Sequence, residues 1–306
     1  MNEILITGYT DPDLDCVACA LAYEEFLNSQ GIEAKAVVFG KPHREAQFVL
    51  DKLGLEVATG EDLINEGCEV ILVDASDVRV SKLIRPEQVI EVIDHRKAHE
   101  AEIFVNAKIQ IELVGSAATL IAEKFFEKKV EISRPMAALL YAAIGSNTIN
   151  FKNRVTTERD RKMAAWLIEK GADKRMVKAM FKAKSELRGS LREIFLQDKG
   201  TWEAGGKRIA IFQLEILKVD EFVKEKLNEV EEFLQDFRKE DRLDVIFLTC
   251  VDLESGFNVF MVVDEFTKGL LEKVLGVKFE RGMTKREGII MRKEIVPLIK
   301  EELERL

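Results

Sequence analysis

The 306-residue sequence predicts an α/β protein of two domains, with a mainly parallel, doubly wound sheet in the first domain and a smaller mixed sheet in the second. Two observations support this fold class. Short apolar runs alternate with segments of helical period through the first hundred residues, which is typical of β-α-β units. A similar pattern restarts after a long helical region, and chains of this length commonly form two domains.

The first domain is predicted from its apolar periodicity. Strands are expected at 3–7, 34–39, 70–74 and 89–93, and helices at 15–30 and 43–53. The region 116–183 is expected to be mostly helical. Within it, Thr157 and Asp160 have the spacing of a capping box that opens a helix ending near Gly171.

The polar stretch 182–192 separates two apolar regions, and we interpret it as the linker between domains at 1–185 and 193–306. Gly205-Gly206 indicates a hairpin turn. The alternating charges of a helix at about 220–239 indicate a solvated face. The other elements expected in this domain are strands at 207–217, 244–251, 257–263 and 287–291, followed by a C-terminal helix.

The net charge of −9 argues against binding to extended nucleic acid or to an anionic membrane surface, since both require a basic face. We see no signal peptide and no apolar run of the roughly 20 residues that span a bilayer. Four cysteines are too few for a disulfide scaffold in a chain of this size, so we expect a cytoplasmic protein.

Acidic side chains follow three of the predicted strands. Asp11, Asp13 and Asp15 come after the first strand, Asp74 ends another, and Asp94-His95-Arg96 follows the strand at 89–93. Ligands of open parallel sheets bind at the carboxyl ends of strands. Because hard divalent cations prefer carboxylate oxygens, the pattern predicts a metal or phosphate site.

Each of these features also has a purely structural interpretation. A single Asp after a strand commonly caps a helix, and Asp11 and Asp13 around Pro12 could form only a turn. The coincidence of three such strand ends favours a site. Cys16 and Cys19 have redox-motif spacing, but we favour a packing role for them. His43 and His99 have no partners at ligand spacing, and we interpret them as surface or loop residues.

The segment Gly8–Ala18 resembles the opening motif of manganese-dependent inorganic pyrophosphatases, within the DHH phosphoesterase superfamily. Four further segments resemble that family in the same order along the chain. They are Asp94-His95-Arg96, Ser146-Asn147-Thr148, the lysine-bearing Phe181–Ser185, and Met291-Arg292-Lys293. The resemblance therefore covers essentially the whole sequence, with a DHH domain followed by a DHHA2-type domain.

The resemblance implies an active site in the cleft between the two domains, where one or two divalent ions, Mn²⁺ or else Mg²⁺ or Co²⁺, activate a water that attacks a phosphoanhydride. By the same resemblance Asp74 would bridge two metals. The implied metal-ligand and catalytic residues are Asp13, Asp15, Asp74 and His95, with a further ligand position at Asn147. We add Asp11 as a candidate metal ligand from this sequence itself. The implied substrate-binding residues are Arg96, Lys184, Arg292 and Lys293.

Several positions depart from the family pattern. Tyr9 and Asn147 replace a His and an Asp among the metal ligands, and we expect both changes to weaken mainly the first of two metal sites. Arg96 replaces a second His, and Met291 replaces a Ser. Asp11 stands where the family usually has Asn. We hypothesise that Asp11 compensates for Asn147, so that the total charge of the site is preserved.

The leading expectation is hydrolysis of inorganic pyrophosphate. Two alternatives stay open: a hydrolase of another small phosphorylated substrate, such as a short polyphosphate, a nucleotide or a phosphodiester, or a catalytically impaired protein that binds a phosphorylated ligand. We expect His95 to be largely neutral near pH 7. The sequence leaves open whether the chain acts alone or as a homodimer.

Overall fold

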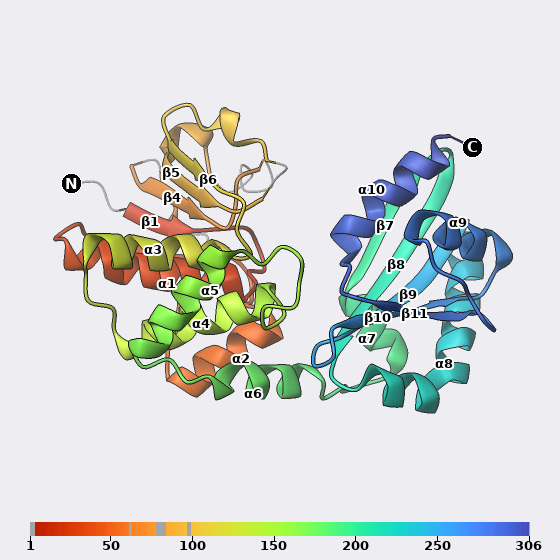
Figure 1. The fold of residues 1–306 in the computed structure, drawn as a ribbon. Coiled ribbons are helices and arrows are strands. Elements are labelled where there is room, and N and C mark those ends of the chain that lie inside the picture. Colours follow the sequence, from red (N-terminus) through yellow and green to blue (C-terminus); the bar gives the residue numbers. More distant parts are fainter. Residues whose placement is uncertain (1–3, 61–62, 66, 78–83, 97–98, 306) are drawn as a thin grey trace. The chain divides into compact units, whose positions relative to one another are not determined.

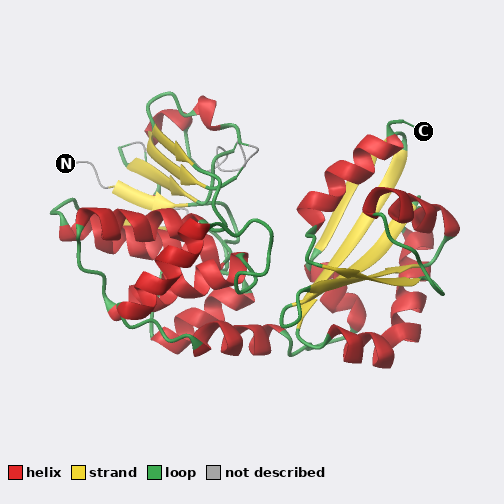
Figure 2. Cartoon of the chain, viewed as in Figure 1, coloured by secondary structure: helices red, strands yellow, loops and turns green. Residues whose placement is uncertain are grey.

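The computed structural model describes all residues except 1–3, 61–62, 66, 78–83, 97–98 and 306. The chain divides into two compact units, and each has a sheet of its own (Figures 1 and 2). The first unit comprises Met1–Phe151 with Val155–Ala183, and the second comprises Lys152–Arg154 with Lys184–Leu306. No helix in the described part of the chain has the length and apolarity to cross a membrane.

The first unit contains a parallel sheet of six strands in the order β3-β2-β1-β4-β5-β6. All neighbouring strands run parallel. The strands are β1 (Ile4–Thr7), β2 (Ala34–Val38), β3 (Ala58–Thr59), β4 (Glu69–Val73), β5 (Val89–Asp94) and β6 (Lys108–Ile111). The strand order reverses between β1 and β4, and open α/β sheets bind ligands at such a switch point, beyond the carboxyl ends of the strands.

Helices cover one face of this sheet. In Figure 1, α1 (Leu14–Ser29) and α3 (Ala117–Lys128) lie along the sheet, and α4 (Arg134–Asn147) and α5 (Glu158–Glu169) lie beyond them. The unit also contains α2 (Arg44–Leu53) and α6 (Arg175–Lys184). The other face buries a separate apolar cluster that includes Leu5, Phe39, Leu72, Val92 and Phe104. Because both faces are buried, the central strands read as continuous apolar runs.

The second unit contains a mixed sheet in the order β11-β10-β9-β8-β7, in which the β8–β9 pair is parallel and the other pairs are antiparallel. The strands are β7 (Lys199–Ala204), β8 (Lys207–Ile216), β9 (Val245–Asp252), β10 (Phe257–Val262) and β11 (Met283–Glu287). The helices are α7 (Leu191–Gln197), α8 (Val219–Glu240), α9 (Glu265–Leu275) and α10 (Arg292–Leu303).

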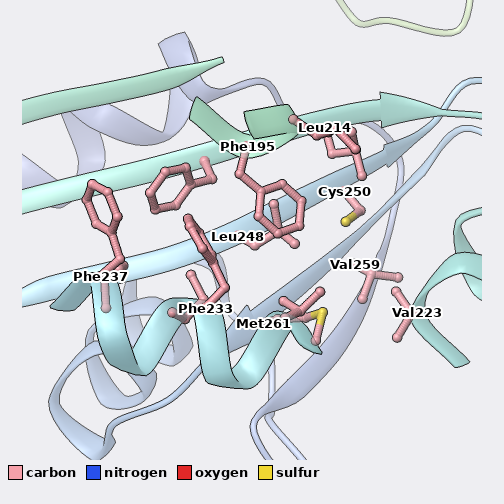
Figure 3. Close-up of a cluster of buried hydrophobic side chains, with 14 of the residues drawn as sticks. Phe195, Leu214, Val223, Phe233, Phe237, Leu248, Cys250, Val259 and Met261 are labelled. Carbon is pink, nitrogen blue, oxygen red and sulfur yellow. The ribbon is translucent and has the colours of Figure 1, made fainter. Parts of the chain in front are cut away.

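Aromatic side chains fill much of the core on one face of the second sheet (Figure 3). Phe233 of α8 lies with its ring centroid 5.0 Å from those of both Phe195 and Phe212. Phe237 meets Phe212 edge-on at 5.2 Å. Edge contacts of this kind add stability beyond the area they bury. The charges of α8 predicted a solvated face on this helix. Its opposite face is apolar and packs into this core.

The predicted fold class is confirmed, with a parallel first sheet and a mixed second sheet. The predicted linker 182–192 overlaps the end of α6 at Lys184 and the start of α7 at Leu191. Two details of the second half were wrong. The last strand lies at Met283–Glu287 and not at 287–291, since its charged sequence pairs at the sheet edge beside β10. Strand β7 was missed because its residues are only partly buried.

Candidate metal centre

Three strand ends of the first unit bring Asp15, Asp74 and His95 together. Each offers a ligand atom, and these atoms all lie within 4.8 Å of one another. A short loop, residues 8–13, joins the end of β1 to α1, where Asp13 is the N-cap and accepts a hydrogen bond from the Cys16 amide at 3.1 Å. Asp15 then lies in the first turn of α1, facing the ends of β4 and β5.

The N-terminus of α3 fixes the Asp15 carboxylate. Its oxygens accept the Ala117 and Ala118 amides, each at 2.9 Å, and the Ser116 hydroxyl at 2.8 Å. A helix N-terminus stabilises an anion through its free amides and dipole. Burial nevertheless raises the pKa of Asp15, and the charge of Asp13 adds to that effect. A buried carboxylate with several fixed donors is a rigid group, which suits a metal ligand.

Asp74 follows β4 in a left-handed backbone conformation, with φ of 53°. That conformation is uncommon for a non-glycine residue and often marks a functional site. Its amide is held by the Ile93 carbonyl at 2.8 Å. The side chain is almost fully buried, and Oδ1 has no hydrogen-bond partner among the described residues. Burial, together with the charges of Asp13 and Asp15, raises the pKa of Asp74.

His95 completes the group with a defined ring orientation. Nδ1 lies 3.0 Å from the Val114 carbonyl, which leaves Nε2 facing Asp74 Oδ1 at 3.4 Å and Asp15 Oδ2 at 3.8 Å. Metal-binding histidines commonly donate their second ring nitrogen to a carbonyl in this way. Burial alone would lower the pKa of His95, but the adjoining Asp74 carboxylate and the charge of Asp15 raise it to about 9.

The expectation of a neutral His95 is therefore wrong for the metal-free protein, because two buried carboxylates stabilise its proton. Two carboxylates and an imidazole nevertheless fit one divalent cation of the Mn²⁺ or Mg²⁺ type. Asp74 Oδ1 supports this fit, since it is buried, accepts no hydrogen bond of normal geometry from the described residues, and has only the His95 ring nitrogen facing it at 3.4 Å. Binding the cation requires His95 to release its proton.

Asn147 lies beside Asp15. At the end of α4 its Nδ2 donates to Asp15 Oδ2 at 2.5 Å, so the departure from Asp falls next to the Asp15–Asp74–His95 group. The expectation that Asn147 mainly weakens the first of two metal sites stays a prediction. An Asn donor satisfies the carboxylate without a metal, whereas an Asp at the same place would repel it.

The Tyr9 and Arg96 side chains meet on the other side of Asp74. The Arg96 guanidinium carbon lies 5.2 Å from the Tyr9 ring centroid, and Nη2 lies 3.6 Å from Asp74 Oδ2. Burial raises the pKa of Tyr9 far above its usual value, and Asp13 and Asp74 raise it further. The phenol therefore stays protonated and is a poor metal ligand.

Asp11 and Asp13 lie outside the group of three. Asp11 is exposed, has a positive φ of 54°, and accepts the Lys41 amide at 3.3 Å. Asp13 is occupied as the N-cap of α1. The hypothesis that Asp11 compensates for Asn147 has no contact to support it and stays a prediction. The role of Asp13 as a ligand also stays a prediction.

The cysteines of the redox-like motif are buried in α1. Burial raises the pKa of both thiols, and nearby carboxylates raise it further. Cys19 donates to Asp15 Oδ1 at 3.6 Å. Thiols with raised pKa values are unreactive at neutral pH, so these contacts favour the packing interpretation.

In the second unit, Lys184 and Arg292 belong to one polar network. Lys184 Nζ lies 2.6 Å from Glu215 Oε2, and Gln213 donates to Glu215 Oε1 at 2.8 Å. Gln213 Oε1 accepts the Arg292 amide at 2.8 Å, and the Arg292 guanidinium binds both the carbonyl and carboxylate of Asp198. The same guanidinium lies 6.0 Å from the Trp202 ring centroid. Lys293 is exposed at the start of α10.

Comparison with known families and proteins decides the family. The N-terminal domain of the DHH family matches residues 3–144, and the DHHA2 domain matches residues 178–302. Two Bacillus relatives whose names describe manganese-dependent inorganic pyrophosphatases match over nearly the full length. The one from B. velezensis is 31% identical and the one from B. subtilis is 30% identical, each over 99% of both chains. The chain belongs to the DHH family.

Solved structures agree with this assignment to the DHH family. A Methanococcus jannaschii protein, described as a candidate family II inorganic pyrophosphatase, is 29% identical with a TM-score of 0.72, over 97% of this chain and 98% of that one. An exopolyphosphatase-related protein from Bacteroides fragilis, with 16% identity and a TM-score of 0.53, shares the fold over 99% of this chain and 92% of that one.

Several residues that build this DHH-family site were missed from sequence. Ser116 and the Val114 carbonyl hold Asp15 and His95, and both belong to the segment before α3. Asp160 of α5 fixes that segment, since its carboxylate accepts the Gly115 amide at 2.9 Å. The Thr157–Asp160 capping box was recognised in the sequence, but the contact of Asp160 with the Gly115 amide was not. The Gly115-Ser116 pair before the apolar helix α3 was the only sequence feature that indicated these residues.

Proposed function

We propose that this DHH-family protein is a manganese-dependent phosphohydrolase with inorganic pyrophosphate as its first candidate substrate. The grouping of Asp15, Asp74 and His95 at the switch point of the first sheet carries this proposal. The names of the full-length Bacillus relatives support the choice of metal and substrate. A small phosphorylated ligand is also consistent with the basic residues that the sequence motifs supply.

The roles of the protein groups follow from their contacts. A bound Mn²⁺ would polarise phosphate oxygens and lower the pKa of a water. Asp15 and Asp74 would balance the charge of the ion, and the Val114 carbonyl, which holds His95 Nδ1, would leave Nε2 free to bind it. Arg96 is positioned to bind a phosphate oxygen as a rigid fork. It cannot deliver a proton to the leaving group, because a guanidinium remains charged.

A second candidate function is the binding of a phosphorylated ligand with little turnover. Tyr9 and Asn147 favour it, since neither supplies the negative charge or the imidazole of the usual ligand set. Fewer charged ligands weaken metal binding and transition-state stabilisation together. Turnover distinguishes the two functions.

The test is phosphate release from pyrophosphate, tripolyphosphate and ATP, each with Mn²⁺, Mg²⁺ or Co²⁺. We expect pyrophosphate with Mn²⁺ to be hydrolysed fastest, and Asp74→Ala to lose at least a hundredfold in kcat, about 2.7 kcal/mol. Asp51→Ala, an exposed change on α2, serves as the control. Saturable ligand binding by calorimetry without phosphate release would reject the hydrolase and favour the binding function.

A further inference from the structure

The Asp74 carboxylate lies between two cationic side chains. Its Oδ1 faces His95 Nε2 at 3.4 Å, and its Oδ2 faces Arg96 Nη2 at 3.6 Å. The imidazole nitrogen on the Oδ1 side can itself bind a metal ion. The guanidinium on the Oδ2 side cannot, because it keeps its charge in proteins and has no acceptor atom. The two oxygens of Asp74 are therefore not equivalent toward metal ions.

Further acidic and aromatic groups hold the Arg96 side chain in place. Nε lies 3.9 Å from Asp94 Oδ1 and Nη1 lies 4.0 Å from Asp77 Oδ2, while the guanidinium covers the Tyr9 ring. Asp94 is itself buried and accepts the Ser76 hydroxyl. A guanidinium held by three carboxylates and a ring face occupies a defined place and is not a mobile surface charge.

We propose that Arg96 takes the place of a second metal ion, so that the centre binds one Mn²⁺ at Asp15, Asp74 and His95 beside a fixed guanidinium. The proposal rests on the proposed metal-dependent function. A second divalent ion on Asp74 Oδ2 would lie within a few ångströms of Arg96, and like charges at such a distance in a buried site repel strongly. Tyr9 presents its ring to the Arg96 guanidinium and supplies neither a carboxylate nor an imidazole for that ion.

A separate observation gives this guanidinium a ligand. Its Nη1 is buried and has no hydrogen-bond partner among the residues that the structure describes. An unsatisfied buried donor is costly, and a phosphate oxygen at this place would satisfy it. Arg96 would thus both neutralise Asp74 and bind the phosphoryl group, two tasks that a second metal ion performs in a dinuclear centre.

The test is the number of Mn²⁺ ions per chain, measured by equilibrium dialysis with metal analysis, together with electron paramagnetic resonance of the loaded protein. We expect one ion with the spectrum of isolated Mn²⁺. The double variant Tyr9→His with Arg96→Gln should bind a second ion and show magnetic coupling between the two. Arg159→Gln, which removes a guanidinium paired with Glu112 and Glu123 elsewhere in the same unit, should still bind one.

Two coupled ions in the unmodified protein would overturn the inference and leave the phosphohydrolase proposal standing. No bound Mn²⁺ would overturn the inference together with the proposed metal centre. A double variant that folds, by circular dichroism, and still binds a single ion would show that Arg96 does not exclude the second one. The stoichiometry of the unmodified protein decides the matter even where the double variant does not fold.

Discussion

His95 shows how one proton couples the metal centre to pH. Its pKa is raised to about 9 by two carboxylates that a metal ion would also bind. A raised pKa means that the pairing stabilises the metal-free fold below the ordinary pKa of 6.5, and that this stability is lost as the pH rises through 9. The raised pKa of Asp74 likewise makes the metal-free fold less stable as the pH rises.

Mn²⁺ affinity should therefore increase with pH while the stability of the metal-free protein decreases. We expect the affinity to rise about tenfold per pH unit between pH 6.5 and 9, with release of about one proton per ion. Calorimetry in buffers of different ionisation enthalpy measures both quantities. His95→Gln should bind more weakly and show a flatter pH profile. An affinity independent of pH in the unmodified protein would contradict the proton exchange.

Substitution of Asn147 by Asp should have opposite effects on the stability of the metal-free protein and on its affinity for Mn²⁺. Asn147→Asp replaces the donor 2.5 Å from Asp15 Oδ2 with a second carboxylate. We expect Mn²⁺ affinity to rise at least tenfold, and the metal-free free energy of unfolding to fall by about 1–3 kcal/mol through like-charge repulsion. Calorimetry and thermal denaturation with and without Mn²⁺ check the two effects.

The control for that substitution is Asn106→Asp. Asn106 donates to the Glu87 carbonyl at the surface and has no contact with the group of three. It makes the same chemical change, and Mn²⁺ affinity should stay within about twofold of the unmodified value. Equal responses of the two variants would mean that net charge, and not the contact with Asp15, determines the affinity.

Sequence reasoning placed Asp15, Asp74 and His95 correctly at neighbouring strand ends because parallel strands align their carboxyl ends at one edge. It could not predict that Asn147 would bond to Asp15, since that contact joins positions 132 residues apart. The protonation of His95 also depends on burial and on two partners from other segments. Such long-range contacts and the local dielectric leave no periodic signal in the sequence.

At the scale of elements, α5 supports the centre through Asp160. This buried carboxylate accepts the Thr157 amide and hydroxyl and also the Gly115 amide and Thr119 hydroxyl, at 2.6–3.0 Å. It therefore joins the start of α5 to the segment before α3, which holds both Asp15 and His95. A helix cap and a metal site share one side chain.

Asp160→Asn should destabilise the protein by about 3 kcal/mol, because an amide presents a donor where every neighbour is a donor. Mn²⁺ affinity should fall as well, since the segment before α3 loses its anchor. Chemical denaturation and calorimetry measure the two changes. Asp264→Asn is the matched control, because Asp264 caps α9 in the second unit through the Thr267 amide and hydroxyl. It should lower stability and leave Mn²⁺ affinity unchanged.

Most helices and strands could be predicted from sequence where one face or both faces of the element are buried. The strands β1, β4 and β5 and the helix α8 have strong apolar patterns, and they were located to within one or two residues. Strands β7 and β11 were missed or misplaced because edge strands carry polar side chains on exposed backbone. Ile289 and Ile290 are buried without belonging to a strand, which explains the wrong position of the last one.

For the whole molecule, a substitution in the second unit should weaken substrate binding without changing metal binding in the first unit. All three residues of the metal group belong to the first unit, and Arg292 belongs to the second. If Arg292 binds substrate as the resemblance implies, Arg292→Gln should raise the KM for pyrophosphate about tenfold or more, which matches the loss of one charge-assisted hydrogen bond. Mn²⁺ affinity should not change.

Steady-state kinetics and calorimetry provide the two measurements. Arg238→Gln is the control, since Arg238 contacts the Leu243 carbonyl and Asp264 away from the Lys184–Arg292 network. An unchanged KM for Arg292→Gln, with Arg238→Gln also unchanged, would remove Arg292 from the substrate site. A loss of Mn²⁺ binding would show that the two units are not independent in metal binding.

The contact of Arg292 with Trp202 also provides an intrinsic fluorescence signal for ligand binding. The chain has two tryptophans, Trp166 in α5 of the first unit and Trp202 in β7 of the second. Trp166 packs edge-on against Phe126, whereas Trp202 lies beside the guanidinium. An anion that draws Arg292 away should change the emission of Trp202 and leave that of Trp166 constant. Trp166→Phe would then give a protein whose fluorescence reports ligand arrival at the second unit without a label.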